Sequence, residues 1–378
     1  MTNRIQLHDR LILMLLKREL NEVEKQEVEN IIFDINFNWE LFLGKVCFNR
    51  VNGMVFRNIR NFTGIPREVK LILEMLNNAQ IEKIDAHKSI LKEIADAFEV
   101  NEIRYAFIKG SVLNNVIYPM GTRISNDIDI LVSPKQLRKV EKLLSKLGYV
   151  QGSYNPKSDD IKHASLAKKL YIRMNTHEVQ SFVRLEENKF IHVNTVDINF
   201  KLSANDSVEV TEYLLDNTCV VSIDDFEVKT LGWDYFFVQL SKHLWREAMS
   251  ASKILSSCDM HFYKYYDFYM LLTDDRVAID WQNVIEIAEK SNQLKSVYYA
   301  LYSINQLFPG IVEDSIFEMF NFEDTRFLDE YMGNEKKDEV FYWNEPFLDR
   351  FFDYSRKTRV DQKVIDASEE YKRNVNNI

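Results

Sequence analysis

The chain has 378 residues, of which 46% are hydrophobic and 28% charged, so it is long enough for two or three structural units with cores of their own. Its formal net charge of −10 argues against general binding to a nucleic-acid backbone, which needs clustered Lys and Arg, but leaves room for a local basic site. The three cysteines, Cys47, Cys219 and Cys258, are far apart, which predicts reduced thiols in the cytoplasm and excludes a disulfide framework or a zinc site.

The N-terminal run "LILMLL" (11–16) is flanked by charged residues and has no small-residue cleavage site, which predicts an amphipathic helix and no secretory signal. This run and "YFFVQL" (235–240) are far shorter than the roughly 18 apolar residues of a membrane span. We therefore expect no membrane as a partner.

Apolar residues recur at helical spacing in both long flanks of the chain. In the segment 68–98 they are Leu71, Met75, Ile81, Ile84 and Ile90. The pattern predicts an N-terminal helical region over 1–98, a core over 99–205 and a C-terminal helical domain over 206–378.

Turn-forming residues are concentrated in the middle of the chain, where seven of the sixteen Gly and Pro lie between Gly110 and Pro156. "YAFIKG" (105–110) predicts a short strand, and Ser111 predicts the N-cap of a helix that ends at Pro119. "DIDILV" (127–132) predicts a second strand because of its β-branched residues.

Two further elements complete the predicted core. Ser133 and Pro134 predict the start of a helix that ends at Gly148, and Gln136 predicts an S-x-x-Q capping box with Ser133. "TVDINFKL" (195–202) alternates apolar and polar residues and predicts a strand. The predicted fold class is α+β, with a small mixed sheet between helical regions.

Two aspartates interrupt the apolar strand 127–132. Asp127 and Asp129 stand at i and i+2, so both carboxylates point to one side of the strand and repel each other unless a cation lies between them. Mg²⁺ suits such a pair because it takes carboxylate oxygens, keeps several waters and binds substrate phosphates. Asp197 on the later strand is the candidate third carboxylate, and Asp159 and Asp160 are its rivals.

The segment "KGS" (109–111) predicts the other half of the site. Gly110 lets the backbone approach a ligand, and amides at the start of the helix opened by Ser111 suit a phosphate group. Lys109 and Arg123 could add positive charge against a polyphosphate. Acid-x-acid pairs are common by chance in so acidic a chain, and it is this context that marks out the pair at 127 and 129.

The string "FIKGSVLNNVIYP...RISNDIDILV" resembles the nucleotidyltransferase superfamily built on the DNA polymerase β-like fold. Its form is similar to the bacterial group called uncharacterised nucleotidyltransferases. The resemblance implies that Gly110 and Ser111 hold the phosphates of a nucleoside triphosphate, that Asp127 and Asp129 hold Mg²⁺, and that Asp197 is the third carboxylate of a two-metal site. Asn199 and Phe200 depart from the His and Trp-containing run that the group often has there.

The implied reaction moves a nucleoside monophosphate from a nucleoside triphosphate, with ATP the expected one, to an acceptor hydroxyl, and releases pyrophosphate. The acceptor, a small molecule or a peptide or protein, is not implied. A protein-adenylylating, antitoxin-type member and an inactive binding protein on the same fold are the alternatives.

Three other features have simpler interpretations. His177 in a polar loop and His243 on an amphipathic helix are more often ordinary surface residues than substrate contacts. The aromatic run 261–272 could stack on a ring, but aromatic residues at helical spacing predict core packing.

Overall fold

The computed structural model describes residues 5–202, 207–332 and 340–376. The chain folds as two compact units. One is formed by residues 78–239, here called the sheet unit, and the other by residues 1–77 and 240–378, here called the helical unit. The two boundaries fall within the helices α5 (Arg67–Val100) and α10 (Trp233–Met249). None of the described helices has a stretch long and apolar enough to traverse a lipid bilayer.

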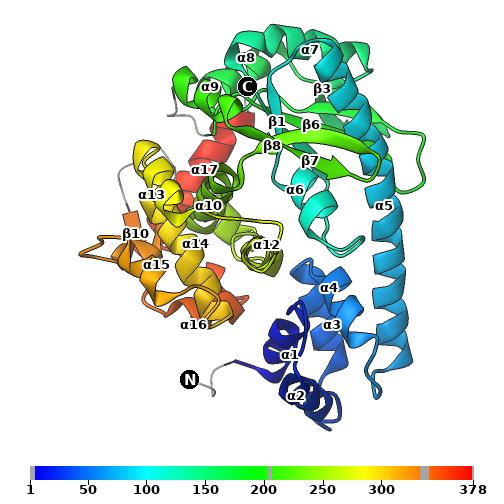
Figure 1. The fold of residues 1–378 in the computed structure, drawn as a ribbon, viewed down its shortest axis with the longest axis vertical. Helices are drawn as coiled ribbons and strands as arrows, with labels where there is room; N and C mark the ends of the chain where they lie inside the picture. The colour runs from blue at the N-terminus through cyan, green and yellow to red at the C-terminus, as the bar shows by residue number, and fades with distance from the viewer. Residues whose placement is uncertain (1–4, 203–206, 333–339, 377–378) are drawn as a thin grey trace. The chain divides into compact units, whose positions relative to one another are not determined.

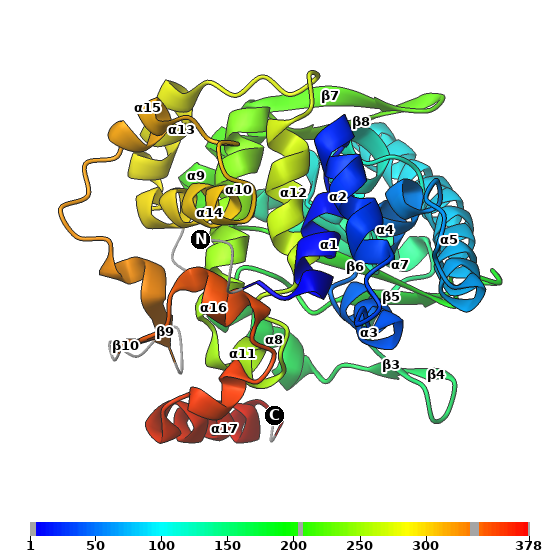
Figure 2. The ribbon, with the colours of Figure 1, turned by 90° about the horizontal axis from the view of Figure 1, so that it is seen from below.

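The sheet unit contains one mixed sheet of eight strands in the order β4-β3-β5-β6-β2-β1-β8-β7 (Figure 1). Its strands are β1 (Tyr105–Ile108), β2 (Asp127–Val132), β3 (Val150–Asn155), β4 (Asp160–His163), β5 (Phe182–Leu185), β6 (Val193–Asn199), β7 (Thr218–Ile223) and β8 (Phe226–Leu231). Figure 2 shows the hairpin of β3 and β4 at one edge of the sheet and β7 at the other. The predicted α+β class with a mixed sheet is confirmed.

Short helices connect these strands. They are α6 (Gly110–Val112), a π-helical turn (Leu113–Ile117), a 3₁₀ turn (Pro134–Gln136), α7 (Leu137–Lys146), α8 (Leu166–Asn175) and α9 (Val208–Asp216). The side chain of Ser133 accepts a hydrogen bond from Lys135 N, as expected of a cap. Gln136 does not close a capping box, because its Oε1 accepts from Arg104 N and its Nε2 donates to Glu102 O.

The sheet is larger than the sequence predicts. β7 and β8 form an antiparallel hairpin inside the segment 206–378, which the sequence predicts to be helical, and Thr230 of β8 pairs in parallel with Phe107 of β1. The hairpin turn at Asp224 has a positive φ of 51° without a glycine, so the usual turn signal is missing. The sheet unit therefore extends beyond 205 to residue 239.

The helical unit contains most of the remaining helices. They are α1 (Leu7–Leu15), α2 (Glu22–Ile32), α3 (Trp39–Phe48), α4 (Asn52–Ile59), α11 (Ala251–Leu255), α12 (Phe262–Leu272), α13 (Trp281–Lys290), α14 (Leu294–Leu307), α15 (Asp314–Glu318), α16 (Phe347–Phe352) and α17 (Gln362–Asn376). Two 3₁₀ turns (Arg326–Asp329 and Arg356–Arg359) and the strand pair β9 (Glu330–Met332) and β10 (Val340–Tyr342) complete it. The predicted N-terminal amphipathic helix is α1.

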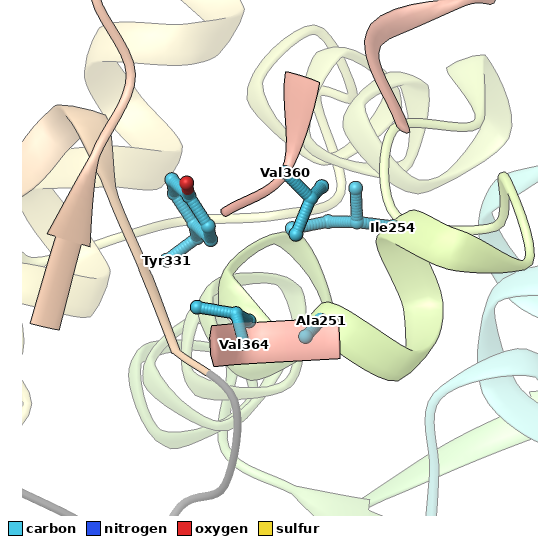
Figure 3. Close-up of a cluster of buried hydrophobic side chains, with 5 residues drawn as sticks. All are labelled: Ala251, Ile254, Tyr331, Val360 and Val364. Carbon is cyan, nitrogen blue, oxygen red and sulfur yellow. The ribbon is translucent and has the colours of Figure 1, made fainter. Parts of the chain in front are cut away.

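Packing within the helical unit joins segments that are far apart in the sequence. Figure 3 shows one buried cluster, in which Tyr331 of β9 lies with Ala251, Ile254, Val360 and Val364. The aromatic run 261–272 is the core helix α12, as its spacing predicts, and Phe262, Tyr265 and Phe268 are all buried.

Candidate active site

Strand pairing brings the predicted acids onto one face of the sheet. β2 and β6 are parallel neighbours, and Asp129 pairs directly with Asp197, while Asp127 pairs with Thr195. Paired residues on adjacent strands point to the same face, and so do residues two apart on one strand. The sequence could not supply this register, because it shows alternation within each strand but not which residues stand opposite each other.

The surroundings of Asp129 and Asp197 disfavour the charged forms of these two carboxyl groups. Asp129 is only 5% exposed, and burial raises its pKa to about 6, with the charges of Asp127 and Glu178 adding to the effect and Lys109 opposing it. Burial, followed by the charge of Asp129, raises the pKa of Asp197 to about 7. Oδ1 of Asp197 is buried and has no hydrogen-bond partner among the described residues. The face therefore carries negative charge that the protein compensates only in part.

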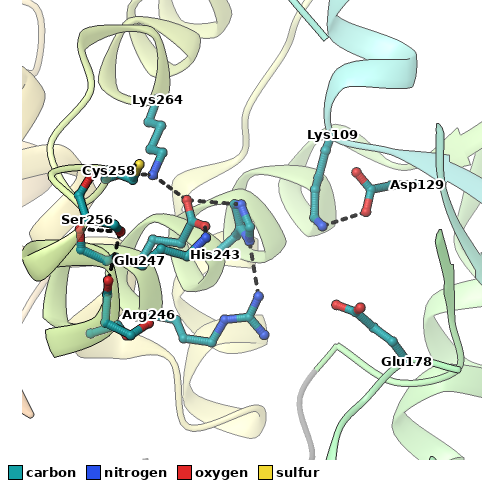
Figure 4. Close-up of polar contacts among 12 residues, drawn as sticks. Lys109, Asp129, Glu178, His243, Arg246, Glu247, Ser256, Cys258 and Lys264 are labelled. Atoms are coloured by element: carbon teal, nitrogen blue, oxygen red, sulfur yellow. Dashed lines mark hydrogen bonds and ion pairs between the residues drawn. The ribbon is translucent and has the colours of Figure 1, made fainter. Parts of the chain in front are cut away.

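Lys109 supplies positive charge directly beside Asp129. Its Nζ lies 2.6 Å from Asp129 Oδ1 in a largely buried ion pair, shown in Figure 4. The residue follows β1 directly and has φ 52° and ψ −127°, a backbone conformation that costs a non-glycine residue about 1–3 kcal/mol. Strain of this kind persists only where the surrounding structure imposes it. Here it occurs at the residue that forms the ion pair with Asp129.

Ser111 is not the N-cap that the sequence predicts. The helix α6 begins at Gly110, so Ser111 lies inside it, and its buried Oγ accepts a hydrogen bond from Asp129 N at 3.2 Å. The serine thereby ties the turn after β1 to the strand that carries the acids.

Arg123 is buried within the loop that leads to β2. It donates to Asn114 Oδ1 at 3.0 Å, lies over the ring of Tyr118, and its carbonyl accepts from Gln80 Nε2 at 3.1 Å. These contacts fix the conformation of the loop.

Gly110 has no room for a side chain. A Cβ at this position would lie 2.5 Å from Ser125 Oγ and 2.8 Å from Arg123 Nη1. We expect Gly110→Ala to lower the free energy of unfolding by about 1–3 kcal/mol through overpacking. Removing the nearer atom with a second change, Ser125→Ala, should restore part of this loss, which a double-mutant cycle by chemical denaturation measures. Strictly additive effects would contradict the steric origin.

The rivals of Asp197 lie elsewhere. Asp159 and Asp160 belong to the hairpin of β3 and β4, and the strands β3, β5 and β6 separate this edge from β2. Asp159 contacts His192 and Tyr154 there. The structure therefore brings Asp197, and not the hairpin acids, to Asp127 and Asp129.

Sequence reasoning missed one acid near this group. Glu178 follows His177, and its charge contributes to the raised pKa of both Asp129 and Asp197. Its carboxylate points toward the side of the sheet where Lys109 and Asp129 meet (Figure 4). The only sequence signal was His177 itself, which lies between the acid-bearing strands and whose Nε2 lies 2.9 Å from Glu178 Oε1.

His243 belongs to a polar cluster of the helical unit. Its Nε2 lies 3.6 Å from the buried Glu247, which also pairs with Lys264 at 2.5 Å (Figure 4). Glu247 pairs with Lys253 as well, at 2.8 Å. Burial raises the pKa of Glu247, but the charges of His243, Lys264 and Lys253 outweigh this effect and hold it well below its usual range. His243 thus contacts Glu247 within this cluster, and its ordinary role stays a prediction.

The pH dependence of stability tests the charge on the acidic face. Because the folded-state pKa of Asp197 is raised, its neutral form stabilises the fold at low pH, and this contribution is lost as the pH rises from about 4 through about 7. Without divalent cations, Asp197→Asn should therefore raise stability at pH 8 by about 1–2 kcal/mol, after allowance for screening, and leave it unchanged near pH 4. Thermal melts at both pH values measure this difference. The control, Asp160→Asn at the exposed sheet edge, should show none, and an equal response of the two variants would contradict the prediction.

The donors of this face fit a magnesium ion. Among the described residues no three His, Cys, Asp or Glu side chains converge on one point, but Mg²⁺ typically needs only one or two carboxylates with waters and substrate phosphates. The buried, unpartnered Oδ1 of Asp197 beside Asp129 is the kind of oxygen that such an ion binds.

A comparison with protein families matches residues 36–309 to the model described as uncharacterised nucleotidyltransferase. This match spans more than half of the chain. The chain belongs to this nucleotidyltransferase family. The matched range contains every acid of the sheet face as well as the Lys109 turn, and the family supports a transferase that acts on nucleotides. No curated protein matches the chain.

Proposed function

We propose that this nucleotidyltransferase is Mg²⁺-dependent and moves a nucleoside monophosphate from a nucleoside triphosphate, with ATP the expected donor, to an acceptor hydroxyl, releasing pyrophosphate. The observation that carries the proposal is the direct pairing of Asp129 with Asp197 next to Asp127, beside the turn that contains Gly110 and Ser111. Acids in this arrangement repel each other and need a cation.

The residues of the face and of the adjacent turn would bind different parts of the reacting complex. Asp127, Asp129 and Asp197 would hold Mg²⁺, which when bound neutralises the charge of the reacting phosphate and the attacking oxygen. Gly110 and Ser111 would contact the triphosphate, with Lys109 as the adjacent cation for its negative charge. Arg123 supports this turn through its contacts with Asn114 and Gln80.

The chemical step balances as a displacement at phosphorus. The acceptor oxygen forms a bond to the α-phosphorus, the bond to the bridging oxygen of pyrophosphate breaks, and the hydroxyl proton passes to a base. Asp197 is the candidate base, because its raised pKa of about 7 suits proton transfer near neutral pH.

Incubation with each α-labelled nucleoside triphosphate, Mg²⁺ and a cell lysate tests the proposal. We expect one triphosphate to label an acceptor and pyrophosphate to be released in equal amount. Label on a protein would favour the protein-adenylylating alternative, and label on a small molecule would favour transfer to a small-molecule acceptor. Binding of nucleotide without transfer in any lysate would favour an inactive binding protein and contradict the proposed reaction.

A further inference from the structure

A β-bulge directs Glu178 onto the acidic face of the sheet. β5 and β6 pair antiparallel with Phe182 opposite Val196, and further along the same edge of β6 Glu178 stands opposite Asn199. Three residues, 179–181, separate the two pairs on one strand, but only two, 197 and 198, on the other. One extra residue in one strand of an antiparallel pair is a bulge, a feature enriched beside active sites because it redirects side chains.

The bulge decides which face Glu178 occupies. If the register of Phe182 and Val196 continued unbroken, Glu178 would stand opposite Phe200, whose buried side chain points away from the face of Asp197. The extra residue instead places it opposite Asn199, two residues after Asp197 and on the same face. Diagonal neighbours of this kind are about 7–8 Å apart, within reach of a long side chain.

Buried contacts hold the bulge in place. Gln180 Nε2 donates to Gly152 O at 2.9 Å, and Gly152 N donates to Ser181 O at 3.1 Å. On the β6 side, Val179 N donates to Ile198 O at 3.1 Å. These hydrogen bonds tie the segment to both neighbouring strands, so the placement of Glu178 is part of the fold.

His177 orients the Glu178 carboxylate. Its Nε2 lies 2.9 Å from Glu178 Oε1, and the two side chains are 12% and 30% exposed. The main chain of His177 is also fixed, because its carbonyl accepts from Phe200 N at 3.0 Å. Carboxylates that bind metal ions are commonly oriented by such a hydrogen-bonded partner.

We propose that Glu178 takes part in binding the divalent cation on the face of Asp127, Asp129 and Asp197, in addition to the one or two carboxylates that Mg²⁺ typically contacts directly, and that His177 positions it. The inference rests on the proposed function, since it adds a residue to the same site. The balance of charge agrees with this inference, because Lys109 is already ion-paired with Asp129, and the negative charge of Glu178 acts on both Asp129 and Asp197.

Titration of the full chain with Mn²⁺, followed by the spectroscopic signal of the free ion, tests this inference without any turnover. Glu178→Gln should weaken Mn²⁺ binding about tenfold, and Glu178→Asp and His177→Gln should each weaken it less. The matched control is Glu187→Gln, which removes the same charge from an exposed position between β5 and β6 and should leave the affinity unchanged.

Two features separate a bound carboxylate from a distant charge or a folding defect. The loss in Glu178→Gln should persist at about 0.5 M KCl, where exposed, distant charges are largely screened. Without metal, the melting temperature of Glu178→Gln should stay at or above that of the wild type, because the change removes a negative charge that repels the aspartates of the face.

The outcomes also distinguish this inference from the proposed function. If Glu178→Gln binds Mn²⁺ as the wild type does while Asp129→Asn does not bind it, Glu178 has no part in cation binding but the proposed site stands. An equal loss in Glu178→Gln and Glu187→Gln would also overturn the inference. If the wild type itself binds no Mn²⁺, both proposals fall.

Discussion

Asp129→Asn is expected to abolish the Mg²⁺-dependent stabilisation of the protein by nucleoside triphosphate. A ligand at 100 times its dissociation constant stabilises the native state by about 2.7 kcal/mol, and this shift should disappear together with transfer of the label. The change also removes one partner of the buried ion pair with Lys109, so the melting temperature of the free variant should fall, and the ligand-dependent shift is measured relative to that baseline. Thermal melts with and without Mg²⁺ and nucleotide measure the loss.

Asp160→Asn provides the matched control. It makes the same change on β4, at the exposed edge of the same sheet, and should retain the full nucleotide-dependent shift. A shift in Asp129→Asn as large as in the control would show that Asp129 does not hold the cation.

Lys109→Met is expected to make the stability of the free protein depend on Mg²⁺. Lys109 forms a buried ion pair with Asp129, and removing one partner of such a pair typically costs about 3–5 kcal/mol, because the other charge is left uncompensated. Part of this loss is offset, because Asp129 can take up a proton once Lys109 is gone. The strained backbone at position 109 is unchanged by the substitution. Mg²⁺ alone should then restore stability, since it replaces the missing ammonium group.

The wild type should bind Mg²⁺ alone more weakly than Lys109→Met does, because the Lys109 ammonium group pairs with Asp129 and competes with the ion. Bound nucleotide should relieve this competition, because its phosphates attract the Lys109 ammonium group away from Asp129. Metal and nucleotide should therefore bind cooperatively in the wild type, and Lys109→Met should lose this cooperativity. Calorimetric titration of each ligand with and without the other measures the coupling. Lys142→Met, on the exposed side of α7, is the control and should behave as the wild type. Equal coupling in wild type and Lys109→Met would contradict a competing lysine.

The strands that carry the site were predictable because their patterns are local. The apolar run before Gly110, the acid pair in an apolar strand and the alternation around Asp197 correspond to β1, β2 and β6. β7 and β8 also alternate, with Val221 and Ile223 before the turn and Val228 and Thr230 after it. A turn of two aspartates without glycine conceals the hairpin, and the helical spacing on both sides favours the wrong interpretation.

What the sequence could not predict depends on pairing between distant strands. The register of Asp129 and Asp197 is set by the sheet, and the face of Glu178 is set by one extra residue in a neighbouring strand. The helix 68–98 was predictable as α5, but Leu71 and Met75, counted there as its apolar face, are 50% and 62% exposed. Periodicity identifies an apolar side of a helix but not what covers it.

The division of the chain has a consequence for its synthesis on the ribosome. The sheet unit is a continuous segment, whereas the helical unit is completed only by residues on both sides of it. Arg18 pairs with Asp274, 256 positions later, and Asn49 Oδ1 accepts from Phe262 N. At about 5–20 residues per second, on the order of ten seconds to a minute passes between the synthesis of Arg18 and that of Asp274. During that interval the N-terminal helices have no C-terminal partners, and a nascent chain stalled soon after residue 239 should contain a folded sheet unit behind a protease-sensitive N-terminus.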